Sequence, residues 1–200
     1  MAKVEAPRVS SPRTVQTAYA ALCDSPTLFD SSDWPEVFEG LAKSGLYSWW
    51  VDTAGARQLS EGIDARVKKG CLYFGQAGGT LWPNGNASHH TLLSRIEGDQ
   101  LNGITSRSAF RRSLAAALKS PLALKTDKQG NLLDASETKL TAWMHEHLSL
   151  AVFQVTNRDE ITNLESQLRP LVNAQLSSFA MPKSKVRVNL AQLREDFAVA

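Results

Sequence analysis

Gly45-Leu46-Tyr47-Ser48-Trp49-Trp50-Val51 and Cys71-Leu72-Tyr73-Phe74-Gly75 are the two stretches that decide the fold. Both are rich in the aromatic and β-branched or otherwise apolar side chains that strands favour, and each carries a tyrosine within two residues of a glycine. The pattern predicts strands over about 45–52 and 71–77. Residues 53–70 between them are polar and are expected to form a connection, with at most a helical turn. We therefore expect the two strands to pair antiparallel.

Helices are expected on both sides of this pair. The N-terminal side carries one helix over 14–23 and one over 35–42, with Asp33 as a cap for the second. After a glycine- and asparagine-rich bend over 78–87, Ser88 is expected to cap a helix, a second begins near 106 or 108 and runs to 119, and a third spans 136–147. A third strand over 148–156 follows, and Asn157 with Glu160 forms a capping box for a helix that should end before Pro170. The fold class is therefore α+β, with a small three-stranded antiparallel sheet flanked by helices.

Composition limits the function classes. The 200 residues are 42% hydrophobic and carry a formal charge of +2, which suits one domain with a real core. No apolar stretch approaches the roughly 20 residues of a membrane span, and the start lacks a secretory signal, so we expect a cytoplasmic protein without a membrane partner. We expect a partly ordered arm over 1–33, a domain over 34–181, and a tail with a short helix over 182–200. Nothing in the sequence indicates an organic cofactor or an oligomeric state.

The tyrosine and glycine pairs on consecutive strands resemble the signature of the GIY-YIG nuclease superfamily. The order strand, strand, three helices, strand, helix is also similar to that family, over about 34–181. Further matching pieces resemble an actinobacterial-type group of GIY-YIG-related proteins: Gly75-Gln76-Ala77-Gly78, Leu93-Ser94-Arg95-Ile96, Ser108-Ala109-Phe110-Arg111, Trp143-Met144-His145-Glu146-His147-Leu148, Leu164-Glu165 and Pro170-Leu171-Val172-Asn173.

This resemblance implies a metal-dependent endonuclease that acts on DNA. It implies that Tyr47 is the base for the attacking water, that Tyr73 and Arg95 lie near the phosphate, and that Glu165 binds Mg²⁺ or Mn²⁺ on the leaving side. Asn173 would orient or support the arrangement. A phenol is a weak base at its ordinary pKa near 10, so Tyr47 needs a nearby cation to accept a proton at neutral pH.

Glu165 is a candidate site residue on its helical spacing alone, without the family resemblance. At about 100° per residue it falls inside the apolar arc of Ile161, Leu164 and Leu168, so its carboxylate is expected to face inward. A buried charge requires a basic partner, a hydrogen-bonded neutral acid, or a divalent cation. Geometry leaves a structural ion pair and a metal as equal alternatives, and the tyrosine motifs favour the metal. One carboxylate with waters and a phosphate oxygen suits Mg²⁺.

Three further residues are candidates for contact with nucleic acid. Gly75 allows a backbone or ligand to approach closely, and Ser108 and Arg111 begin a basic helix of the kind that holds phosphate. The alternative for an arginine in such a pair is simple solvation, and for a strand tyrosine it is packing.

One departure from the family pattern bears on activity. The related group commonly has a histidine in Asn-His-Leu, where this chain reads Asp99-Gln100-Leu101. Gln100 cannot exchange a proton, so the alternative function is a catalytically weak or inactive nucleic-acid-binding module on the same scaffold. A purely structural protein ranks lowest, and salt-dependent binding of nucleic acid would argue against it.

Overall fold

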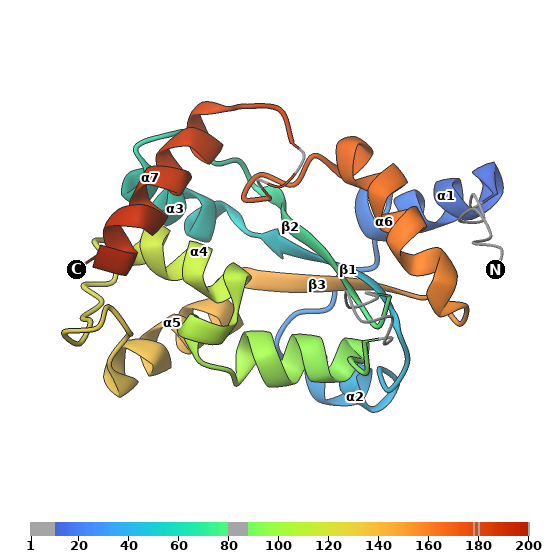
Figure 1. Ribbon diagram of the computed structural model, residues 1–200, viewed down its shortest axis with the longest axis horizontal. Helices are drawn as coiled ribbons and strands as arrows, with labels where there is room; N and C mark the ends of the chain where they lie inside the picture. The colour runs from blue at the N-terminus through green and yellow to red at the C-terminus, as the bar shows by residue number, and fades with distance from the viewer. Residues whose placement is uncertain (1–10, 80–87, 178, 180, 200) are drawn as a thin grey trace, which may run out of the picture.

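The computed structural model describes residues 11–79, 88–177, 179 and 181–199 (Figure 1). Its centre is a three-stranded antiparallel sheet of β1 (Gly45–Val51), β2 (Gly70–Ala77) and β3 (Leu148–Gln154), in the order β2-β1-β3. The predicted fold class and the pairing of the first two strands are confirmed. Of the bend expected over 78–87, residues 80–87 lie outside the described residues.

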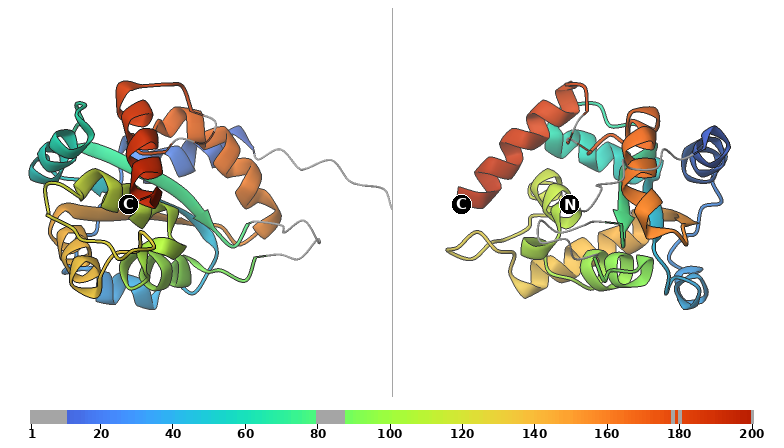
Figure 2. Two further views of the ribbon diagram at one scale, coloured as in Figure 1. Left: turned by 60° about the vertical axis from the view of Figure 1, so that its left-hand side comes forward. Right: turned by 45° about the vertical axis from the view of Figure 1, so that its right-hand side comes forward.

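Two apolar clusters cover the two faces of the sheet. One contains Leu46, Phe74 and Ala151 and is covered by α1 (Pro12–Tyr19), the π-helical η1 (Ala20–Asp24) and α6 (Arg158–Val172). The right-hand view of Figure 2 shows α1 and α6 on the same side of the sheet. Segment 11–24 belongs to this layer, because Ala18 and Leu22 are fully buried in it, and Phe29 then bridges to the edge strand β3.

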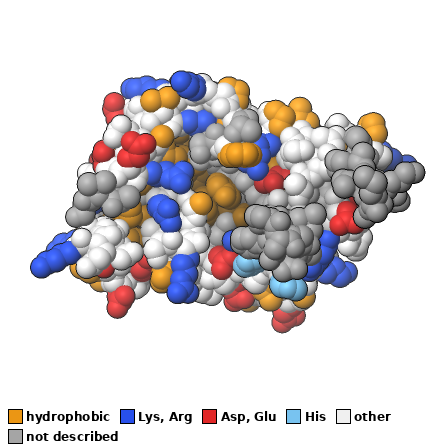
Figure 3. Space-filling view, in the orientation of Figure 1, with side chains coloured by type: hydrophobic (Ala, Val, Ile, Leu, Met, Phe, Trp, Pro, Cys, Tyr) orange, Lys and Arg blue, Asp and Glu red, His pale blue; other side chains and the backbone are white. Residues whose placement is uncertain are grey.

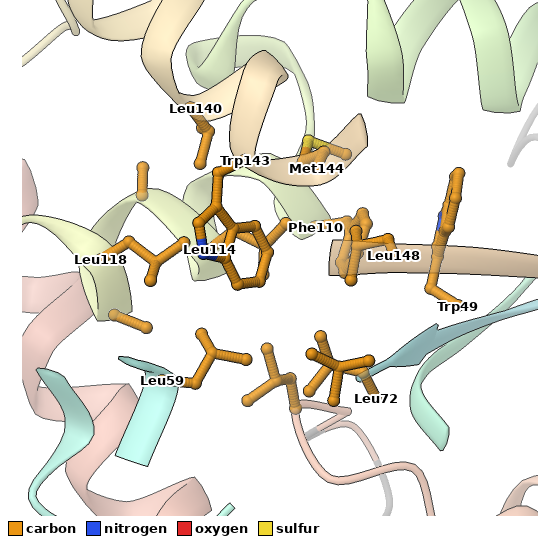
Figure 4. Close-up of a cluster of buried hydrophobic side chains, with 14 of the residues drawn as sticks. Trp49, Leu59, Leu72, Phe110, Leu114, Leu118, Leu140, Trp143, Met144 and Leu148 are labelled. Atoms are coloured by element: carbon orange, nitrogen blue, oxygen red, sulfur yellow. The ribbon is translucent and has the colours of Figure 1, made fainter. Parts of the chain in front are cut away.

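The opposite face carries the larger cluster, which Figure 4 shows around Trp49, Phe110, Trp143 and Met144. Its helices are α2 (Trp34–Glu39), the π-helical η2 (Ser94–Leu101), the short 3₁₀ turn η3 (Thr105–Arg107), α4 (Ala109–Leu118) and α5 (Asp134–His147). At one end α3 (Thr53–Ile63) and α7 (Lys185–Val199) pack on α4. The sheet is therefore buried on both faces.

The segment between β1 and β2 corrects one prediction. Residues 53–63 form the eleven-residue helix α3, where only a helical turn was expected. Asp52 caps it through Oδ1, which accepts from Gly55 N at 2.7 Å, and it ends at Asp64 in the left-handed region. Ala56, Leu59 and Ile63 are buried at helical spacing, so packing of this apolar side stabilises the helix. The largely polar composition of the segment did not predict it.

Two helix ends also differ from the prediction. Pro170 lies inside α6, which continues to Val172 and ends at Asn173 with a φ of 47°. A proline so near the end removes one backbone donor from the last turn only, so the helix tolerates it. The C-terminal helix spans 15 residues instead of a short piece, because Leu190 and Phe197 pack into the core.

Candidate active site

The strand register brings the two signature tyrosines together. Tyr47 lies opposite Gly75 and Trp49 lies opposite Tyr73, so all four residues share one face of the sheet. The rings of Tyr47 and Tyr73 have centroids 6.4 Å apart. A Cβ at position 75 would lie 2.7 Å from the Tyr47 hydroxyl oxygen and 2.8 Å from its Cζ. Gly75 is therefore required because the Tyr47 phenol occupies the space of any side chain.

Gln100 connects Tyr47 to a second aromatic residue. The Gln100 Nε2 donates to the Tyr47 hydroxyl at 2.6 Å, and the Trp49 Nε1 donates to the Gln100 Oε1 at 2.6 Å. An indole N–H is a donor only, so Trp49 fixes which end of the amide faces Tyr47. The Tyr47 oxygen therefore receives a hydrogen bond from Gln100, and its own hydroxyl proton is free to point elsewhere.

Burial raises the pKa of Tyr47 well above the ordinary phenol value near 10, and neighbouring Tyr73 adds to the rise. The guanidinium of Arg95 and the hydrogen bond from Gln100 act in the opposite direction without cancelling it. Tyr47 is therefore a neutral phenol in the free protein at neutral pH. This protonation state opposes its expected role as a base unless a cation or substrate changes its surroundings.

A cavity of about 180 Å³ opens beside this tyrosine pair. Six of the residues that were expected to form the site line it together with Gln76, Gln100 and Phe110: Tyr47, Tyr73, Gly75, Arg95, Ser108 and Glu165. Arg95 is about one third exposed and pairs with Asp99 at 2.8 Å. Ser108 caps α4, where its Oγ accepts from Arg111 N at 3.3 Å. Figure 3 shows a hollow on this side of the molecule with apolar side chains inside it and Lys or Arg side chains around it.

Glu165 reaches the same cavity from α6, which packs along the edge strand β2. Its neighbours Ile161, Leu164 and Leu168 are fully buried as expected, and Glu165 itself is 9% exposed. Its carboxylate accepts from Arg169 at 2.5 Å, so the basic-partner alternative is realised in the described chain. Burial raises the pKa of Glu165, while Arg169 and a hydrogen bond with Gln76 oppose that rise.

The comparisons with known proteins agree with this arrangement. A family model described as the GIY-YIG catalytic domain matches residues 45–196, about three quarters of the chain. The chain belongs to this family. No curated protein and no solved structure shows a significant match. The GIY-YIG catalytic domain is of nuclease type, and the matched range begins at the first residue of β1 and extends into α7.

In this GIY-YIG domain, two of the predicted site residues lie outside the cavity. Arg111 is fully buried, so its predicted contact with nucleic acid is wrong for this structure. Its guanidinium donates to Glu137 at 2.7 Å and to the carbonyls of Gln100 and Leu101 at 3.0 and 2.8 Å. Arg111 therefore fastens the end of η2, and with it Gln100, to α5.

Asn173 also lies elsewhere. It is exposed at the end of α6, and its Oδ1 accepts from Arg187 at 2.8 Å. Eight residues separate it from Glu165, which corresponds to about 12 Å along a helix. Its predicted role of orienting the metal arrangement therefore has no support from its position, and its visible role is to tie α6 to α7.

The residues fit a single hard cation rather than a dedicated metal cage. Among the described residues no group of three His, Cys, Asp or Glu side chains could hold a metal ion. Glu165 is the one carboxylate among the residues that line the cavity, and Gln76 beside it has a buried Oε1 without a hydrogen-bond partner. Mg²⁺ commonly uses one or two carboxylates together with waters and substrate phosphate, so this donor set is sufficient.

Sequence reasoning missed the roles of Gln100, Trp49 and Gln76. Gln100 was noted only as a lost histidine, whereas the structure makes it the partner of the first signature tyrosine. Gln100 follows the apolar Ile96 by four residues, and this helical spacing was the available signal of an inward location. None of the described helices is long and apolar enough to cross a membrane.

Proposed function

We propose that the chain is a metal-dependent endonuclease that hydrolyses DNA phosphodiester bonds. The observation that carries the proposal is the convergence of Tyr47, Tyr73, Arg95 and Glu165 on one cavity, from two strands and two helical segments. These residue types supply a hydroxyl for water, a cation for phosphate and a carboxylate for a metal, which are the needs of phosphodiester hydrolysis.

In this proposal Arg95 and Tyr73 bind the scissile phosphate, and Ser108 donates to it from the start of α4. Tyr47 contacts the attacking water, because Gln100 occupies its oxygen from one side and leaves its hydroxyl proton for the cavity. Glu165, with Gln76 beside it, would hold the cation. A bound divalent cation supplies charge relief for the phosphate and a more acidic water.

The ion pair of Glu165 with Arg169 has a consequence for this role. Glu165 could hold a cation only if Arg169, which contacts its carboxylate at 2.5 Å, turned away. Arg169 is then available to a phosphate of the same strand, since it also lines the neighbouring space beyond Tyr73. The pair is therefore compatible with a resting state of the enzyme.

The test is cleavage of supercoiled plasmid and branched DNA with Mg²⁺ or Mn²⁺ by wild type, Glu165→Gln and Glu61→Ala. Glu165→Gln keeps the shape and a contact for Arg169 but removes the charge, and Glu61→Ala removes an exposed carboxylate on α3 as the matched control. We expect nicking by wild type and the control and a loss of at least 100-fold in Glu165→Gln. Equal cleavage by Glu165→Gln would refute the assignment of the metal ligand.

The second candidate is a non-catalytic nucleic-acid-binding module on the same scaffold. The closed pair of Glu165 with Arg169 and the presence of Gln100 at the histidine position favour it. This candidate predicts no cleavage by wild type with any metal or substrate, together with equal DNA affinity in wild type and Glu165→Ala. A cytoplasmic location stays a prediction from the sequence.

A further inference from the structure

A second cavity of about 250 Å³ adjoins the first. The two share Tyr73, Ala109 and Glu165 in their linings, so they adjoin along these residues. The second cavity lies between β2, α4, α6 and α7, and its outer wall comes from the segment that follows α6. Of the roles proposed above, only the release of Arg169 toward a phosphate reaches into this space.

An arginine without a partner lines the second cavity. Arg194 lies on α7, is half-buried, and has no ion pair or hydrogen bond with any described residue. Burial raises the pKa of Tyr73, and Arg194 is close enough for its charge to oppose that rise. Arg169 of α6 also lines the cavity, so two guanidiniums face it against the carboxylate of Glu165, the one acidic group among the described lining residues. The cavity is therefore suited to an anion.

The segment that follows α6 adds an exposed aromatic ring and a hydroxyl to the cavity lining. Phe179 is 76% exposed, and the guanidinium carbon of Arg169 lies 5.3 Å from its ring centroid. Ser177 is 6% exposed, and its Oγ has no hydrogen-bond partner among the described atoms. An exposed ring beside a cation is the arrangement that proteins use to stack an unpaired base, and a free hydroxyl can donate to phosphate or sugar.

We propose that this second cavity is a subsite for one unpaired nucleotide of the DNA strand that is cut, next to the scissile phosphate. Arg194 and Ser177 bind the phosphate or sugar, and Phe179 stacks on the base. The volume is below that of typical small-molecule pockets, which begin at about 300 Å³, so it suits one nucleotide rather than a base pair. In a duplex the faces of the base are covered by its neighbours, so stacking on Phe179 selects flaps, gaps or branches.

This inference rests on the proposed function, because the strand is assigned by the first cavity. It also gives α7 a functional role, although that helix lies beyond the 34–181 domain expected from the sequence. Substrate choice would then depend on a residue in the last seven positions of the chain, on an element that packs against α4 and α3.

The test is DNA binding by fluorescence anisotropy with the full chain in EDTA, where no cleavage occurs. The probes are a blunt duplex and the same duplex with a three-nucleotide single-stranded flap. The variants are Phe179→Ala, Phe179→Trp and Arg194→Ala. Leu133→Ala and Arg57→Ala remove an exposed apolar side chain and an exposed arginine elsewhere as matched controls.

We expect Phe179→Ala to weaken flap binding by about five- to 100-fold, the range for one base stacked on an aromatic ring, and to change duplex binding by less than about twofold. Phe179→Trp should retain flap binding. Arg194→Ala should weaken flap binding and reduce the slope of log affinity against log salt by about 0.7, the value for one single-strand phosphate. The controls should bind both probes like wild type.

Unchanged flap binding in Phe179→Ala and Arg194→Ala would overturn the proposal, and so would an equal loss on flap and duplex in Phe179→Ala. Metal-dependent cleavage by wild type decides the proposed function separately. If Phe179→Ala selectively loses flap binding and wild type does not cleave DNA, the subsite is supported and the nuclease is rejected. If wild type cleaves DNA and both Phe179→Ala and Arg194→Ala bind the flap like wild type, the nuclease is supported and the subsite is rejected.

Discussion

Replacing Gln100 with leucine tests the polar connection on which the first cavity depends. Gln100 is 3% exposed, so bulk water has little access to its two hydrogen bonds of 2.6 Å. Gln100→Leu leaves the Trp49 N–H and the Tyr47 hydroxyl without their partner. Each stranded buried group costs about 1–3 kcal/mol, so the free energy of unfolding should fall by about 2–6 kcal/mol.

For a chain of this size each kcal/mol lowers the melting temperature by about 2–4 °C, so we expect a drop of about 5–20 °C. Urea denaturation followed by circular dichroism measures the free energy directly. Gln58→Leu is the matched control, because Gln58 Oε1 accepts a single bond from the Trp143 indole at 2.5 Å in a half-buried place. Its expected cost is about 0.5–1.5 kcal/mol.

Gln100→His provides the rescue. A neutral imidazole has one donor and one acceptor, so it can accept from Trp49 and donate to Tyr47 as the amide does. We expect it to recover at least half of the stability that leucine loses and to retain cleavage. The reasoning is refuted if Gln100→Leu costs less than about 1 kcal/mol, or no more than Gln58→Leu does.

Three other outcomes are expected. In Gly75→Ala the new methyl group overlaps the Tyr47 hydroxyl. Overpacking should lower the free energy of unfolding in urea by about 1–3 kcal/mol, and cleavage should fall at least tenfold. Unchanged cleavage would show that the phenol is free to move. Arg111→Met leaves the half-buried carboxylate of Glu137 unpaired and should cost about 3–5 kcal/mol by the same assay, and a cost below about 1 kcal/mol would contradict the buried pair. Because the folded-state pKa of Tyr47 lies above the unfolded value near 10, the stability this phenol contributes is complete below pH 10 and is lost as the pH rises through the folded pKa. The difference in tyrosinate absorbance between wild type and Tyr47→Phe should therefore appear only above pH 10, and a midpoint below pH 8 would contradict the neutral phenol.

The sheet and its signature residues could be predicted because they are encoded locally. Successive side chains of a strand point to opposite faces of the sheet, and the close pairing of Gly75 with Tyr47 requires only two adjacent strands. The inward face of Glu165 was equally predictable, since Ile161, Leu164 and Leu168 define the buried side of one helix. These features depend on residues a few positions apart or on neighbouring strands.

The errors arise where distant segments decide the outcome. Arg111 was interpreted as a phosphate contact because arginines and serines at a helix start commonly bind phosphate, but α4 is buried on nearly all sides between α3, α7 and the sheet. Its charge is balanced by Glu137 from α5, 26 residues later. Helix α3 was missed for the same reason, since its apolar side is short and becomes stable only by packing.

The sequence by itself determined the strand pair, the two tyrosines with their glycine and the inward carboxylate, because periodicity and local sterics specify them. Only the tertiary structure decided that Gln100 donates a hydrogen bond to Tyr47, 53 residues away in sequence, and that Arg169 pairs with Glu165. It also decided that Arg194 of the last helix lines the cavity next to the site. Hydrogen bonds and charges act over a few ångströms of space, and a linear pattern carries no record of which distant residues folding brings within that range.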